Sequence, residues 1–246
     1  KLVSILEKVE KTALSGNLVG SGDGVKDQGI QFSSGSPSGT LSAVLVEIMP
    51  EEHASVEKLL LARLFQLPDS GGFHAICSAS KNVGWLFLHD KAWVNIHLLP
   101  KFSLDCDASC SAWSGLLANN HFYSSVEFWE CLKKDFIKLP EKVKEWGYTN
   151  SWSSIYTWLI ESYIEYKSSG RGLDKGSIRS IIRKLDDEQK IKLVDNISAS
   201  VDDEEISDMI FDFISDCWPK ESCYRNSRLT ESWLSMLSNS PEYFGK

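Results

Sequence analysis

The sequence of 246 residues contains no uninterrupted apolar run of the roughly 18–20 residues that a membrane-spanning helix needs. Its first residues are apolar in part, but Glu7, Lys8, Glu10 and Lys11 interrupt them, which excludes the hydrophobic segment of a signal peptide. We therefore expect a cytoplasmic protein that neither spans a membrane nor is exported.

Closely spaced metal ligands are absent too. The closest pairs among the six cysteines are Cys106-x3-Cys110 and Cys217-x5-Cys223, whereas zinc sites favour C-x2-C spacing. The five histidines form no H-E-x-x-H motif. Several cysteines lie in apolar segments, where a free thiol behaves as a small hydrophobic side chain. We therefore expect reduced cysteines and no bound metal.

No complete nucleotide-binding or catalytic motif occurs in the sequence. Gly20, Gly22 and Gly24 suggest a phosphate-binding loop, but no Gly-Lys-Ser/Thr follows them and residues 25–29 do not begin a helix. A cysteine and a histidine that are distant in sequence could still meet in the folded chain as a nucleophile pair. An enzyme with an unrecognised helical active site is therefore an open alternative, although the sequence itself identifies no catalytic residue and no cofactor.

Positive charge is scarce: the sequence has 26 Lys and Arg but 34 Asp and Glu, which gives a formal net charge of −8. Residues 186–216 contain 11 acidic residues against two lysines, Lys190 and Lys192. A negative field repels phosphate backbones and anionic lipids, which disfavours nucleic acid as a partner. The acidic segment is either the solvated face of amphipathic helices or a docking surface for a basic protein.

A small basic cluster precedes the acidic segment. It consists of Arg171, Lys175, Arg179, Arg183 and Lys184. Arg179 and Arg183 are four residues apart, so a helix would place them on one face. Either the cluster pairs with the acidic segment inside the protein, or Arg171, Arg179 and Arg183 form an interaction surface that steers assembly with other proteins. Contact with nucleic acid is a further alternative.

Helical periodicity dominates from Leu41 almost to the end of the chain, and no alternating apolar and polar run indicates a strand. The pattern predicts a mainly α protein, an irregular solenoid-like array of about ten short amphipathic helices. We expect residues 1–40 to form an N-terminal helix followed by a mobile Gly- and Ser-rich loop. Residues 41–246 are expected to form one helical-repeat-like domain.

Large aromatic side chains mark the expected core. Trp113 has Leu116 and Leu117 at helical spacing, which predicts that it points inward, and Trp93 is expected at a helix crossing. Gly115 would allow two helices to approach closely, and Pro219 would end a helix.

Dispersed residues of the chain share an arrangement with a known family. They are Asp90-Lys91-Ala92-Trp93 with Leu98-Leu99-Pro100, Ala112-Trp113-Ser114-Gly115-Leu116-Leu117, and Trp218-Pro219-Lys220 with Leu234, Leu237 and Phe244. Ser36-Pro37-Ser38-Gly39, before an apolar helix, fits the same arrangement. From about Pro37 onward the chain resembles the helical C-terminal region, a domain of unknown function, of large prokaryotic sirtuin-like antiphage defence proteins.

The resemblance implies a role without catalysis. In such proteins an N-terminal sirtuin-like domain degrades NAD, while the helical region holds the assembly together or senses infection. The sequence has no counterpart of the Gly-Ala-Gly nucleotide loop or of the catalytic His and Asn of that domain. We therefore expect a scaffold or sensor segment of a longer protein. Its expected partners are proteins: the rest of the parent chain, a second copy, or a phage-derived trigger.

Overall fold

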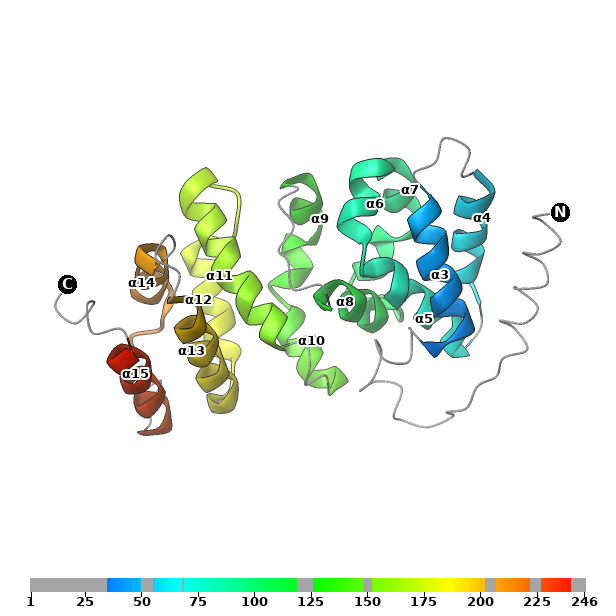
Figure 1. Ribbon diagram of the computed structural model, residues 1–246. Coiled ribbons are helices and arrows are strands. Elements are labelled where there is room, and N and C mark those ends of the chain that lie inside the picture. The colour runs from blue at the N-terminus through cyan, green and yellow to red at the C-terminus, as the bar shows by residue number, and fades with distance from the viewer. Residues whose placement is uncertain are drawn as a thin grey trace. The chain divides into compact units, whose positions relative to one another are not determined.

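The computed structural model describes residues 35–49, 55–67, 69–118, 126–147, 152–201, 207–221 and 227–239. These residues form thirteen α-helices and one 3-10 helix, and none of them lies in a strand (Figure 1). The predicted mainly α class is therefore confirmed, whereas the solenoid-like stacking stays a prediction. Within the same residues, every helix is too short or too polar to cross a lipid bilayer.

Two compact units make up the chain, and each is described by itself. The N-terminal unit contains Lys1–Asn119, Tyr123–Asp135 and Lys142–Ser151, and the C-terminal unit contains Asn120–Phe122, Phe136–Glu141 and Trp152–Lys246. The sequence predicted a single domain over residues 41–246. Amphipathic periodicity reveals which face of a helix is apolar, but not which other helix covers that face.

In its described residues the N-terminal unit has nine helices, of which α9 and α10 also contribute residues to the C-terminal unit. They are α3 (Pro37–Ile48), α4 (Ser55–Leu64), α5 (Asp69–Ser80), α6 (Val83–His89), α7 (Lys91–His97), the 3-10 helix η2 (Leu99–Phe102), α8 (Ser109–Leu117), α9 (Val126–Phe136) and α10 (Leu139–Trp146).

The start of α3 overlaps the loop that the sequence predicted up to Gly39. Ser36 is the N-cap, and its hydroxyl oxygen accepts a 3.0 Å hydrogen bond from the amide of Gly39, while Pro37 occupies the first helical position. A proline is tolerated there because its missing N–H would have no partner within the helix. The expected N-terminal helix and the rest of the Gly- and Ser-rich loop lie outside the described residues.

The core of the N-terminal unit lies where α5 packs against both α3 and α8. The buried hydroxyl of Ser42 on α3 donates a 2.8 Å hydrogen bond to the carbonyl oxygen of Ala75 on α5. On the other side of α5, a Cβ atom added to Gly115 of α8 would overlap the carbonyl oxygen of Cys77. Glycine is therefore required for this helix crossing, as the sequence predicted.

Trp113 of α8 is fully buried, which confirms that it points into the core. Its indole N–H donates a 2.8 Å hydrogen bond to the carbonyl oxygen of Phe102 in η2, and the two rings meet edge to face at 5.4 Å. The hydrogen bond satisfies the one polar atom of a large buried side chain. Trp113 therefore ties α8 to η2.

The described part of the C-terminal unit contains α11 (Trp152–Ser169), α12 (Lys175–Lys184), α13 (Asp187–Val201), α14 (Ser207–Cys217) and α15 (Ser227–Asn239). The long helix α11 packs against α12, α13 and α14, and α13 also packs against α15. The residues of α11 at helical spacing that face the other helices are buried, namely Ile155, Trp158, Leu159 and Tyr163.

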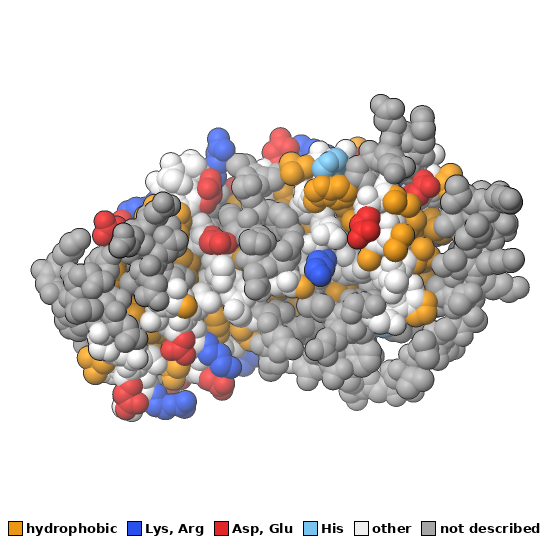
Figure 2. Space-filling model, viewed as in Figure 1, with side chains coloured by type: hydrophobic (Ala, Val, Ile, Leu, Met, Phe, Trp, Pro, Cys, Tyr) orange, Lys and Arg blue, Asp and Glu red, His pale blue; other side chains and the backbone are white. Residues whose placement is uncertain are grey.

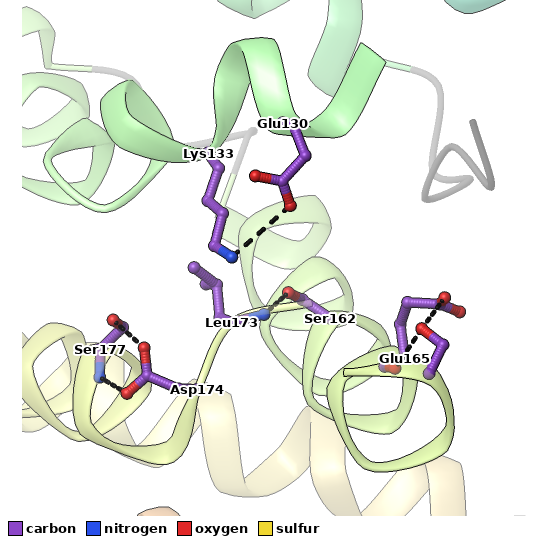
Figure 3. A network of polar contacts seen from close by, with 8 residues as sticks. Glu130, Lys133, Ser162, Glu165, Leu173, Asp174 and Ser177 are labelled. Carbon is purple, nitrogen blue, oxygen red and sulfur yellow. Dashed lines mark hydrogen bonds and ion pairs between the residues drawn. The ribbon is translucent and has the colours of Figure 1, made fainter. Parts of the chain in front are cut away.

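The turn between α11 and α12 is built from small residues. Gly170 ends α11 with a φ of 76°, a left-handed conformation that favours glycine. The hydroxyl oxygen of Ser162, inside α11, accepts a 2.7 Å hydrogen bond from the amide of Leu173 (Figure 3). A Cβ atom on Gly172 would overlap the carbonyl oxygen of Ser162. The chain thus folds back tightly onto α11 before α12 begins.

Candidate functional site

One surface pocket of the C-terminal unit collects charged side chains. It has a volume of about 490 Å³, and Arg179, Arg183, Lys220 and Glu221 line it. The two arginines come from α12, and the other two residues follow α14. Three cations and one carboxylate give the lining a formal charge of +2 in a chain whose net charge is −8. We call this feature the basic pocket.

The amphipathic pattern of α12 places the arginines at the surface. Ile178, Ile181 and Ile182 form its buried face, so Arg179 and Arg183 lie on a different side of the helix. Asp174 fixes where the helix begins, because its carboxylate accepts hydrogen bonds from the amide of Gly176 (2.8 Å) and from that of Ser177 (3.1 Å). Figure 3 shows the contacts between Asp174 and Ser177.

Arg179 is anchored at the end of α14. Its Nη2 donates a hydrogen bond to the backbone carbonyl oxygen of Asp216. The side chain of Asp216 is fixed in turn, since one oxygen accepts a 2.8 Å hydrogen bond from the hydroxyl of the fully buried Tyr163. Lys167 lies 2.9 Å from Asp212 and 3.9 Å from Asp216. This network ties α11, α12 and α14 together beneath the pocket.

Burial and these contacts shift the titration of two groups near Asp216. Burial, supported by the hydrogen bond to Asp216, raises the pKa of Tyr163 well above its usual value. Burial also raises the pKa of the Cys217 thiol to about 12, and the charge of Asp216 adds to the effect. Cys217 is therefore a protonated, weakly nucleophilic thiol at neutral pH.

The remaining basic residues differ in their surroundings. Arg183 pairs with Glu221, and Lys184 lies 2.9 Å from Glu141. Neither carboxylate belongs to the acidic segment 186–216, so the predicted pairing of these two cations with that segment is wrong. Arg171 is exposed in the turn after α11 and is not among the residues that line the pocket. The three arginines predicted as one surface are thus only partly brought together.

The seven residues of the family-like arrangement form no single site. Asp90 caps α7 by accepting a 3.0 Å hydrogen bond from the amide of Trp93, which is buried, and Asp90 also lies 2.6 Å from Lys58. Pro100 is exposed in η2, and Trp113 and Gly115 lie in the α8 core. These five residues belong to the N-terminal unit.

The other two family-like residues, Trp218 and Pro219, follow α14 in the C-terminal unit. Trp218 packs edge to face on Trp233 of α15 with ring centroids 4.8 Å apart. Pro219 is buried two residues after the last residue of α14, so it follows the helix end as the sequence predicted. The seven residues therefore have local structural roles: Asp90 caps a helix, and most of the others are buried or packed against a neighbouring ring. Pro100 is the exception, since it is exposed in η2.

A second surface feature, which the sequence did not reveal, is apolar and lies in the N-terminal unit. Large hydrophobic side chains are exposed in pairs one helical turn apart, Val44 with Ile48 on α3, Val56 with Leu59 on α4, and Trp85 with Leu88 on α6; Ile96 on α7 is exposed as well. We call these seven residues the apolar face. Figure 2 shows hydrophobic side chains gathered over α3 and α6.

Helical spacing on α6 is consistent with this face but does not by itself identify it. On α6, Val83, Leu86 and Phe87 already supply the buried side, so the apolar Trp85 and Leu88 are in excess of what burial of the helix needs. Apolar residues all around a seven-residue helix indicate either a deeply buried helix or an exposed apolar surface. Only the tertiary structure distinguishes the two cases.

Among the residues that the structure describes, no three His, Cys, Asp or Glu side chains come close enough together to hold a metal ion. None of the five cysteines within that part of the chain forms a disulfide bond, and Cys77 and Cys217 are buried.

Comparison of the chain with protein-family models, with curated proteins and with solved structures found no match. The resemblance to sirtuin-like antiphage defence proteins therefore stays a prediction. The apolar face and the basic pocket are the two observations from which a function is inferred.

Proposed function

We propose that this chain is a non-catalytic helical scaffold segment that mediates protein–protein interaction, and that its N-terminal unit associates with a second copy through the apolar face. The observation that carries the proposal is the exposure of Leu88 and Ile96, which keep 72% and 69% of their accessible surface. Burying a leucine or isoleucine side chain contributes roughly 1.5–3 kcal/mol. A face with several such side chains is typical of a protein–protein interface.

Trp85 supports the same proposal, since tryptophan is enriched among the residues that dominate binding energy at interfaces. Its ring packs against His89 at 4.3 Å, and His89 Nδ1 lies 2.9 Å from the carbonyl oxygen of Trp85. The indole is therefore held in a defined orientation at the surface, which reduces the entropy that binding would cost.

The charges beside the face favour a second copy as its occupant. Lys58 pairs with Asp90, and Lys91 pairs with Glu127, both at 2.6 Å. In the described part of the N-terminal unit, nine Lys and Arg balance ten Asp and Glu. Two copies can therefore approach through this unit without the repulsion that a net charge of −8 would otherwise cause. A two-fold arrangement, the commonest oligomer symmetry, places the same apolar residues on both sides.

In the context of the family resemblance, self-association gives the segment a scaffold role. A longer defence protein would use it to bring several upstream sirtuin-like, NAD-degrading domains together. A phage-derived trigger would act on such an assembly by binding to it.

The test is the oligomeric state of the purified chain, measured by sedimentation velocity over a range of concentrations. We expect a reversible dimer. Leu88→Asp and Ile96→Asp should each raise its dissociation constant at least about tenfold, because the interface would bury an unpaired carboxylate. Asn95→Asp is the matched control, since Asn95 is exposed on α7 beside Ile96 and the variant adds the same charge. A chain that stays monomeric at all concentrations, or an equal effect of Asn95→Asp, would overturn the proposed self-association.

Two other functions are tested in the same preparation. Turnover of NAD or ATP by the chain alone would contradict its non-catalytic role and favour the enzyme alternative. Binding of a labelled oligonucleotide at physiological salt, lost in Arg179→Gln, would favour the nucleic-acid alternative instead.

A further inference from the structure

We infer that the basic pocket of the C-terminal unit binds a phosphate group, supplied by a small molecule or by a phosphorylated protein. The pocket lies in a different unit from the apolar face, so the inference is independent of the proposed self-association.

Arg179 is both held in place and incompletely bonded. One of its five N–H groups donates to the carbonyl oxygen of Asp216, which orients the guanidinium. Its buried Nε has no hydrogen-bond partner within the described part of the chain. A guanidinium that is fixed in position can bind an oxyanion through its outer Nη groups with little loss of side-chain entropy, whereas the buried Nε does not face the ligand.

Arg183 and Lys220 complete the cationic lining. Arg183 is one helical turn from Arg179, so both guanidinium groups reach the same pocket. The Arg183 contact with Glu221 is exposed to water, which makes it weak and exchangeable. Two guanidinium groups and one ammonium around a compact dianion are the usual arrangement for phosphate recognition.

The surrounding charge limits what the ligand can be. Asp208, Asp212 and Asp216 on α14 and the acidic residues of α13 lie in the same unit. A long polyanion such as a nucleic-acid strand would meet this repulsion, whereas a single phosphate group needs only the pocket itself. The pocket volume of about 490 Å³ exceeds that of inorganic phosphate, so the group would be part of a larger ligand.

NMR of the arginine Nε–Hε groups in the 15N-labelled chain tests the inference. Inorganic phosphate is added at constant ionic strength. The signals of Arg179 and Arg183 should shift and saturate at millimolar phosphate, while that of Arg171 stays in place, because Arg171 does not line the pocket. Malonate, a dicarboxylate of similar charge, should bind more weakly than phosphate.

Variants of the pocket separate specific binding from general charge attraction. Arg179→Gln and Arg183→Gln should each weaken phosphate binding at least about fivefold, through loss of a charge-assisted hydrogen bond. Glu221→Gln should strengthen it, because it removes the only carboxylate among the four lining residues. Arg171→Gln is the matched control, with the same charge change at an exposed arginine outside the pocket lining, and should have no effect.

Two further titrations identify the source of the phosphate. Tighter binding of AMP than of inorganic phosphate would assign the pocket to a small molecule, and tighter binding of a phosphoserine peptide would assign it to a phosphorylated protein. Equal shifts at Arg171, equal binding in Arg171→Gln and Arg179→Gln, or tighter binding of malonate than of phosphate would overturn the inference.

Discussion

At the scale of single residues, two large buried side chains of this protein combine apolar packing with a specific polar contact. Trp113 buries its ring in the α8 core and donates its one N–H to Phe102, and Tyr163 buries its ring while its hydroxyl donates to Asp216. In each case the polar atom reaches a partner on another element, because an unpaired buried donor would destabilise the fold. These two hydrogen bonds therefore help to determine which helices pack against each other, in addition to stabilising the packing.

Trp113 provides the prediction at this scale. Trp113→Ala should lower the free energy of unfolding by about 3–5 kcal/mol, since a large cavity would replace the ring. Trp113→Phe keeps most of the packing but loses the hydrogen bond to Phe102, so it should cost less. Urea denaturation followed by circular dichroism measures both. An alanine variant with unchanged stability would show that Trp113 does not support the core.

At the scale of elements, each helix end depends on a few local side chains. Asp174 accepts hydrogen bonds from the first turn of α12, including a 2.7 Å bond from the Ser177 hydroxyl. This hydroxyl, followed by the backbone amides, lowers the pKa of Asp174 below its usual value. The same cap begins the helix that carries Arg179 and Arg183 of the basic pocket.

The prediction at this scale concerns Asp174→Ala and its pH dependence. The variant should lose about 1 kcal/mol of stability at neutral pH, the usual value of an N-cap side chain. Because the folded pKa lies below the unfolded one, the wild-type advantage is present above about pH 4 and is lost as pH falls through the folded pKa. Unfolding of both proteins from pH 7 to about pH 2 measures this. An advantage that persists at the lowest pH would contradict the role of the ionised cap.

At the scale of the whole molecule, the two surface features lie in different units and have different chemistry. Helices α4 and α7 of the apolar face carry Lys58 and Lys91, which pair with Asp90 and Glu127, whereas the basic pocket combines three cations with one carboxylate. Association through the first is governed by apolar burial, and binding at the second is governed by charge.

The dependence on salt concentration should distinguish association through the apolar face from binding at the basic pocket. Between about 50 mM and about 500 mM NaCl, the dimer dissociation constant should change little, since salt screens exposed charges but does not weaken apolar contacts. Phosphate binding over the same range should weaken markedly. Charge reversal by Arg179→Glu with Arg183→Glu should leave dimerisation unchanged. Slower dimer formation in that double variant at low salt would instead favour the hypothesis that the charged segments steer assembly.

Some helix boundaries follow from local chemistry. Gly170 ends α11, Asp174 begins α12 and Pro219 follows α14, in each case because of backbone geometry within one or two residues. Asp107 has a side chain suited to an N-cap, but Ala108 occupies the N-cap position of α8 and provides no side-chain hydrogen bond. A cap residue needs the right backbone conformation as well as the right side chain.

The sequence alone thus determined the helical class, the inward direction of Trp113 and the close approach at Gly115, because helical periodicity and residue size are local properties. Only the tertiary structure decided that the helices form two units, and that Arg179 and Arg183 meet Lys220 and Glu221 in one pocket. These pairings join residues some forty positions apart. Helical periodicity does not predict such long-range pairings, because they depend on which apolar helix faces pack against one another when the chain folds.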